Sequence, residues 1–329
     1  MIRRFLLYIL LIISSSTLSQ DIHFSHPNFF GSYYNPAEIS FSEYEYNFAL
    51  GNRQQWRSIS TPFNTLYFAT SKKIFNQKQT NELLTTGFYI NYDKAGDTEL
   101  GILQFNIPVS FPVFQNKMKT VCVSAGMTLG YARNNINKSK ILTNQQITQP
   151  GSDNTVIDIE YFSIWNISAG LFGFYKIGKN KINISYSVSN INEPKLSFTT
   201  NKSILNRRTY FQCSDNIKIS NNFDLSPFFV LSFQQHFREY YLGTLYSLYL
   251  TSKSIQKISI GSAYRFKDAM NVIMEIRYQK TDFFVIYDFN TSTLKEASNF
   301  RGGIELGLKY QMNTTKTKPQ KILKCPMFI

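Results

Sequence analysis

Residues Thr120 to Tyr131 read TVCVSAGMTLGY, and the hydrophobic residues in this stretch occupy every second position. These positions are Val121, Val123, Ala125, Met127, Leu129 and Tyr131. The positions between them are small or polar, namely Thr120, Cys122, Ser124, Gly126, Thr128 and Gly130. Successive side chains of a β-strand point to opposite faces, so the stretch predicts a strand with one hydrophobic and one polar face. In the alternating stretches 271–279 and 303–312 the polar face carries Glu, Arg, Lys and Gln. Such strands cannot be buried on both faces, so a doubly covered parallel sheet is excluded.

The same alternation recurs along most of the chain and predicts fourteen strands. Most segments have ten or more residues, longer than is usual in soluble proteins but the right length for tilted strands that cross a membrane. Many carry aromatic residues near their ends, as the interfacial girdles of membrane barrels do. We therefore predict an all-β fold, a transmembrane outer-membrane β-barrel of about 14 antiparallel strands over residues 44–312. A soluble β-sandwich or propeller is the alternative, but its strands should be shorter and its surface more charged. The predicted strands are 44–51, 61–72, 82–92, 99–111, 119–133, 164–177, 181–190, 207–221, 224–238, 240–252, 254–266, 269–279, 282–290 and 300–312.

The lengths of the connections indicate how the barrel is oriented. With both termini in the periplasm, the long connections 134–163, 191–206 and 291–299 lie outside the cell. Tight turns such as Gly178–Asn180 and Lys280–Thr281 then lie in the periplasm, as in other outer-membrane barrels. Two predicted periplasmic connections, 73–81 and 112–118, are longer than this pattern favours.

The two ends of the chain lie outside the predicted barrel. Arg3 and Arg4, the hydrophobic run 5–13 and the small residues that follow are typical of a signal peptide, here residues 1–19. Residues 20–43 are rich in Phe, Tyr, Asn and Ser and are predicted to plug the lumen or to lie beneath the barrel. Residues 313–329 form a basic C-terminal tail.

Composition and motifs argue against several functions. The 329-residue chain has a net charge of +14, but an exported protein does not meet nucleic acid, so acidic proteins and anionic lipids are the expected partners. The sequence has no GxSxG, GxGxxG, Walker or HExxH motif, and no enzyme activity is predicted. His23 and His26 have a spacing that could suit a metal, but no Cys or carboxylate cluster accompanies them. No metal site and no cofactor are predicted.

Several strings, in order along the chain, resemble the type IX secretion system membrane proteins of the PorP/SprF family. The resemblance begins with Asn35–Pro36–Ala37 after an aromatic lead-in and continues with GNRQQWRSISTPFNTLYFA from Gly51. It ends with Lys324–Cys325–Pro326–Met327–Phe328, where the family usually has a basic residue in place of Met327. Between these lie Asp93–Lys94–Ala95–Gly96–Asp97, Asn190 to Pro194, Tyr287–Asp288–Phe289 and Arg301–Gly302–Gly303–Ile304–Glu305.

The resemblance implies a non-enzymatic barrel of the fatty-acid-transporter type that supports export or surface attachment of large secreted proteins, including gliding adhesins. It implies three partners: the type IX translocon with its periplasmic components, a secreted cell-surface protein or adhesin, and outer-membrane lipid. The alternative function is a channel for small solutes. The polar residues predicted to face the lumen, among them Glu275, Arg277, Glu305 and Lys309, suit a wet or plugged interior.

The motif residues are the candidate partner-binding residues. A structural role is the alternative for each of them. Asn35–Pro36 could direct the chain into the first strand, and the aspartates could pair with the arginines at the extracellular mouth. The candidates are Tyr34, Asn35, Pro36, Arg53, Trp56, Arg57, Asp93, Asp97, Asp288, Arg301, Cys325, Pro326 and Phe328.

Overall fold

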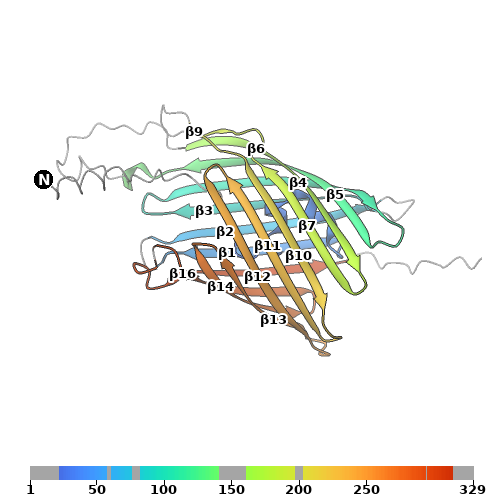
Figure 1. Cartoon of the computed structure of the whole chain (residues 1–329). Helices are drawn as coiled ribbons and strands as arrows, with labels where there is room; N and C mark the ends of the chain where they lie inside the picture. Colours follow the sequence, from blue (N-terminus) through green and yellow to red (C-terminus); the bar gives the residue numbers. More distant parts are fainter. Residues whose placement is uncertain are drawn as a thin grey trace, which may run out of the picture.

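Fourteen antiparallel strands close into a barrel in the computed structural model (Figure 1). The structure describes residues 22–57, 61–75, 82–140, 161–196, 203–293 and 295–313. The last strand, β16 (Arg301–Met312), pairs with the first, β1 (Tyr46–Gln55), and this pairing closes the barrel. The other strands are β2 (Phe63–Phe75), β3 (Glu82–Ala95), β4 (Leu100–Gln115), β5 (Val121–Asn135), β6 (Tyr161–Ile177), β7 (Asn180–Ser189), β10 (Arg208–Lys218), β11 (Phe223–Gln234), β12 (Phe237–Tyr249), β13 (Ile255–Arg265), β14 (Ala269–Tyr278) and β15 (Thr281–Asn290).

The predicted strand number and order are confirmed, and most predicted ends lie within a few residues of the observed ones. The largest differences are of four residues each. Strand β1 continues past its predicted end to Gln55, β4 continues through Pro112 to Gln115, and β11 ends at Gln234 rather than at 238. Proline cannot donate to the ladder, and the β4–β5 register shifts between Pro112 and Phe114. A two-stranded hairpin, β8 (Lys195–Leu196) with β9 (Ser203–Ile204), lies in the connection 191–206, where no strand was predicted.

The two faces of the strands have the predicted orientation. On β5, Met127 and Leu129 are 59% and 51% exposed on the outside of the protein, whereas Ser124 and Thr128 are 0% and 3% exposed in the lumen. The lumen faces of β7 and β16 are likewise polar, with Ser185 and Glu305 among their buried residues. The outer face of the barrel is therefore hydrophobic, as a surface in contact with lipid has to be.

The two rims of the barrel differ in their connections. One rim carries the three longest, which are 136–160, 190–207 and 291–300, and we call it the long-loop rim. At the other, the tight-turn rim, connections run from two residues (279–280) to six (76–81). The observed strand ends thus shorten the two connections that the sequence analysis found too long.

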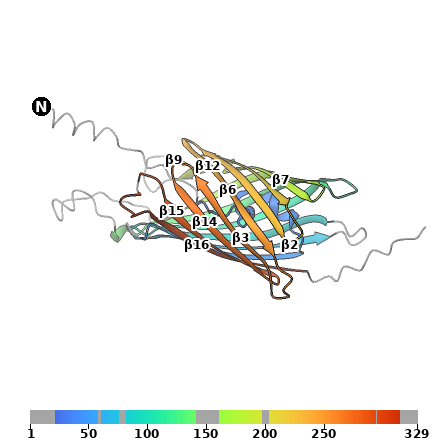
Figure 2. The same ribbon diagram turned by 60° about the horizontal axis from the view of Figure 1, so that its bottom comes forward.

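The N-terminal segment, residues 22–45, lies inside the barrel. Figures 1 and 2 show it in blue between the walls in both views, and we call it the plug. It contains the short helix α2 (Gly31–Tyr34) and the 3-10 helix η1 (Pro36–Phe41), and η1 contacts β3, β4, β5 and β6. Of the two predicted locations for this segment, the lumen is the observed one. None of the helices in the described ranges is long and hydrophobic enough to cross a membrane.

Candidate functional site

Aromatic side chains form the centre of the contact between the plug and the barrel wall. Phe24 stacks on Phe30 with ring centroids 3.9 Å apart, and Tyr34 stacks on Tyr210 of β10 at 4.6 Å. Phe29 meets Phe284 of β15 edge to face at 4.5 Å. Pairs of this kind contribute about 0.5–1.5 kcal/mol each beyond the area that they bury. The aromatic residues of 20–43, which the sequence analysis noted, therefore fix the plug to the wall.

Arg53 of β1 holds the plug through ionic contacts. One guanidinium nitrogen, Nη2, lies 3.0 Å from Oδ2 of Asp288, and Nε lies 3.8 Å from Oε2 of Glu305. Its other nitrogen, Nη1, donates to the backbone carbonyl of His23 in the plug. Glu305 also accepts the backbone N–H of Ser25 at 2.9 Å. The predicted Arg–Asp pairing is thus present for Arg53 and Asp288, and it binds the N-terminal segment.

A second arginine, Arg265 of β13, extends this network. It donates to the hydroxyl of Ser25 at 3.3 Å and to Asp268 at 3.1 Å, and its Nε lies 3.6 Å from Glu239. The hydroxyl of Tyr241 donates to the carbonyl of Ser25 at 2.7 Å. Five strands of the wall, β1, β12, β13, β15 and β16, therefore converge on residues 23–25. We call Arg53, Arg265, Asp288, Glu305, Glu239 and Ser25 the plug clamp.

Asn35–Pro36–Ala37 attaches the far part of the plug to the opposite wall. The side chain of Asn35 accepts the N–H of Ala37 at 2.9 Å and so caps η1, where Pro36 suits the first turn. The amide of Asn35 donates to the carbonyl of Leu171 and to the hydroxyl of Ser185, both at 2.8 Å. Ser124 donates to the carbonyl of Ala37 at 2.7 Å. The motif therefore joins a helix cap to β5, β6 and β7.

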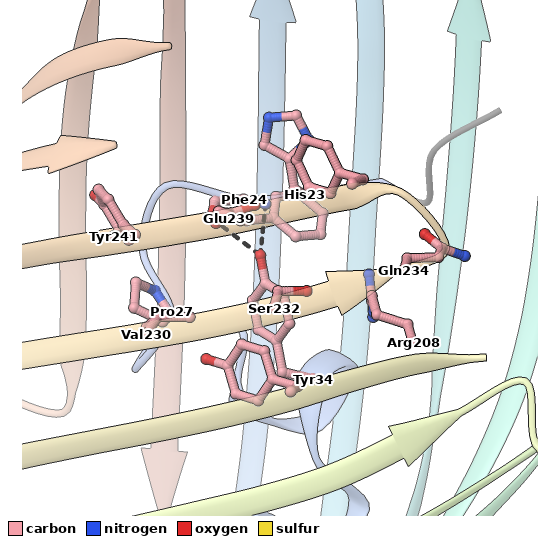
Figure 3. A pocket seen from close by; sticks show the side chains of 12 residues that line it. His23, Phe24, Pro27, Tyr34, Arg208, Val230, Ser232, Gln234, Glu239 and Tyr241 are labelled. Carbon is pink, nitrogen blue, oxygen red and sulfur yellow. Dashed lines mark hydrogen bonds between the residues drawn. The ribbon is translucent and has the colours of Figure 1, made fainter. Parts of the chain in front are cut away.

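A small cavity lies between the plug and the wall at β10–β12, with a volume of about 20 Å³ (Figure 3). This is room for one water molecule. His23, Arg208 and Glu239 line it, and the Tyr34 hydroxyl exchanges hydrogen bonds with the backbone of Phe24 at its edge. Burial, followed by the nearby guanidinium groups, holds the pKa of His23 well below its usual range. A neutral imidazole beside several arginines adds no further positive charge to the site.

Other predicted site residues lie at the long-loop rim. The backbone N–H of Trp56 donates to the backbone carbonyl of Gly302 at 2.9 Å, and its ring lies 4.8 Å from the ring of Phe63, measured between the ring centres. Asp97 accepts from Thr61, and Asp93 accepts from Thr65 at 2.5 Å. The predicted ion pairs of Asp93 and Asp97 with arginines are not among the contacts of the described residues, where both carboxylates accept from threonines.

The predicted set thus divides into three groups. Tyr34, Asn35, Pro36, Arg53 and Asp288 are buried inside the barrel. At the rim, Arg57, Asp97 and Arg301 are exposed, and Trp56 and Asp93 are half-buried. Cys325, Pro326 and Phe328 lie outside the described residues. The sequence analysis did not select Ser25, Arg265 or Arg208. For Arg265 and Arg208, the sequence signal that could have found them is an arginine at a lumen-facing position at the end of a strand. Among the described residues, no group of three or more His, Cys, Asp and Glu side chains is arranged to hold a metal ion.

Comparison with known families identifies the barrel. A model of the type IX secretion system membrane protein PorP/SprF matches residues 16–316. The chain belongs to the PorP/SprF family. Membership associates it with the type IX secretion machinery. No curated protein matches the sequence.

Two solved structures with a similar fold are a transporter and a channel. The toluene transporter TodX of Pseudomonas putida is 11% identical, with 89% of this chain and 94% of that chain covered and a TM-score of 0.54. The CymD monoaromatic hydrocarbon channel is 10% identical, with 86% and 92% covered and a TM-score of 0.50. At such identities the likeness shows the fold alone. The predicted fold class is confirmed, and this PorP/SprF protein is an outer-membrane β-barrel.

Proposed function

We propose that this PorP/SprF protein is a closed anchoring barrel that holds a large secreted protein, such as a gliding adhesin, at the cell surface. The observation that supports this most is the plug, because the protein's own residues 22–45 occupy the lumen. The plug clamp fixes them at one end and Asn35 fixes them at the other. A barrel filled in this way acts through its rims rather than by conducting solutes.

In this proposal the predicted site residues have two separate roles. The buried ones, Tyr34, Asn35, Pro36, Arg53 and Asp288, hold the plug in place. Arg57, Asp97 and Arg301 are exposed near Trp56 at the long-loop rim, where a secreted partner would make contact. Trp and Arg are the residue types that dominate binding energy at protein interfaces.

The tail residues Cys325, Pro326 and Phe328 have a different partner in this proposal. A basic tail with a hydrophobic end would dock on an acidic periplasmic component of the type IX machinery. Removing residues 324–329 should then leave the barrel inserted and abolish surface display of the cargo. Unchanged display at normal expression would show that the tail is dispensable.

The anchoring role can be tested by complementation of a deletion strain. We would compare the wild-type gene with the rim variant Arg57→Ala/Asp97→Ala/Arg301→Ala, with Lys253→Ala at the opposite rim as the control. Protease shaving of intact cells and analysis of the medium would locate large secreted proteins. We expect the rim variant to release cargo into the medium at normal barrel levels.

The same strains distinguish the other functions. Cargo that accumulates in the periplasm of the deletion strain would assign the protein to export rather than to anchoring. Normal cargo display together with lost uptake of a small solute would favour the channel.

A further inference from the structure

Lysines face the lumen side by side at the tight-turn rim. Lys176 of β6 and Lys181 of β7 are direct cross-strand partners, two positions beyond the pair Phe174–Asn183. Their ammonium groups lie 5.4 and 4.5 Å from the centre of the Phe174 ring. Lys218, at the end of β10, follows lumen-facing Asn216, which pairs with Lys181. We call Lys176, Lys181 and Lys218 the lysine cluster.

This arrangement is unfavourable for folding alone. Like charges that lie directly opposite on one face of a sheet are destabilising, and an opposite-charge pair would stabilise the same site. None of the ion pairs among the described residues includes a lysine of the cluster. Asp224 of β11 lies directly opposite Lys218, whereas Lys176 and Lys181 face each other and make no ion pair with the described residues. Their positive charge suits an anionic group from outside the barrel.

A cavity of about 360 Å³ adjoins the lysine cluster inside the lumen. Lys181 lines it on one wall and Lys309 of β16 on the far wall. Amide and hydroxyl side chains of Asn183, Ser214 and Asn216 also line it. These groups can donate and accept hydrogen bonds, as the backbone of a bound peptide requires.

The chemistry of the site limits what can occupy it. Bilayer lipid is excluded, because these side chains face the lumen and not the outer surface. A bare phosphate would suit the lysines but would leave most of a cavity of about 360 Å³ unfilled. A peptide with acidic side chains suits the whole site, because its carboxylates meet the lysines and its backbone meets the amide and hydroxyl side chains. The cavity has room for about two or three residues.

We propose that the tight-turn mouth of the lumen binds a short acidic peptide segment of a partner protein. Lys176, Lys181 and Lys218 receive its carboxylates, and the cavity beneath the plug receives its end. The site lies at the rim opposite to the one that anchors cargo in the proposed function, and it does not depend on that function.

Binding can be measured by fluorescence anisotropy on the full-length protein in detergent. The probe is a fluorescein-labelled hexapeptide of alternating Glu and Ser with a blocked C-terminus, and the control peptide has Gln in place of Glu. We expect Lys176→Gln/Lys181→Gln to weaken binding of the Glu peptide by about tenfold or more, since two charge-assisted hydrogen bonds are lost. Lys253→Gln/Lys280→Gln removes the same charge from other tight turns and should change binding less than about twofold.

Three results would overturn the proposal. The first is equal binding of the Glu and Gln peptides, and the second is an equal loss in the two double variants. The third is an unchanged affinity in Lys176→Gln/Lys181→Gln. Folding is checked by the gel shift between unheated and heated samples. If the double variant does not fold, Lys218→Gln replaces it, and unchanged affinity in that folded variant contradicts the assigned cluster.

Discussion

Arg53 is the residue on which the plug clamp depends most. Its side chain is 1% exposed, and the side chains of Asp288 and Glu305 are 4% and 1% exposed. Removing one partner of a buried ionic network leaves an uncompensated charge, which costs about 3–5 kcal/mol. Arg53 contacts the backbone of the plug as well as both carboxylates, so its loss affects the plug before it affects the strands.

We predict that Arg53→Ala releases the plug while the barrel stays closed. The expected results are faster proteolysis within residues 22–45 and a measurable conductance in planar bilayers. Arg57→Ala, an exposed arginine four residues away, is the control and should change stability by less than about 0.5 kcal/mol. A protected plug in Arg53→Ala would show that the aromatic contacts suffice without the clamp.

Gly126 tests the other attachment of the plug. A Cβ built on Gly126 would lie 2.5 Å from the backbone nitrogen of Ala37 and 2.6 Å from the carbonyl carbon of Pro36. The backbone of the plug therefore lies so close to β5 that a residue with a side chain does not fit at position 126.

We predict that Gly126→Val displaces η1 from the wall and leaves the strand pairing of β5 intact. Hydrogen exchange should then increase at residues 37–40 and stay low in β5. Ala125→Val, one residue away on the outer face, should leave exchange in the plug unchanged. If both variants behave alike, the close approach at Gly126 does not matter for the plug.

At the scale of the strand, the sequence was most informative where one face meets lipid and the other meets polar side chains. Thr120–Tyr131 shows this best, because its alternation gave both the strand and its faces. The alternation could not locate the plug contacts, since Arg53, Asp288 and Glu305 are separated by up to 252 positions and meet only when β1 pairs with β16. Nor could it place Asn35, whose partners lie on β6 and β7.

The faces of β5 give a prediction about the bilayer. Ala125→Arg puts a charge on the lipid face near the middle of the strand, which costs about 2–4 kcal/mol in barrels of this kind. The folded fraction in the heat-modifiability gel should fall accordingly. Ser124 is not a neutral control, because it is fully buried and donates to Ala37 of the plug. Ser226→Arg is better, since Ser226 lines the open lumen cavity, and it should have the smaller effect.

At the scale of the whole molecule, the path of the chain through the lumen bears on how the barrel sits in the membrane. β16 ends at the tight-turn rim, so a periplasmic tail requires that rim to face the periplasm. Ile22 lies toward the other rim, where its carbonyl accepts from Arg208, the first residue of β10. The plug therefore runs from the long-loop rim to the tight-turn rim before β1 begins. The prediction that both termini are periplasmic stays a prediction, and this path argues against it for the N-terminus.

Surface labelling decides between the two arrangements. In a background in which Cys122, Cys213 and Cys325 are replaced by Ser, we expect Asp97→Cys to react with a membrane-impermeant maleimide on intact cells. Lys179→Cys, at the tip of a tight turn, should react only after the outer membrane is permeabilised. An epitope inserted between Gln20 and Asp21 then reports on the start of the chain. Two residues reach at most about 7 Å from Ile22, so the epitope should be detected on intact cells. Detection only after permeabilisation, with Asp97→Cys still labelled from outside, would place both termini in the periplasm and would mean that the chain returns through the lumen before residue 22.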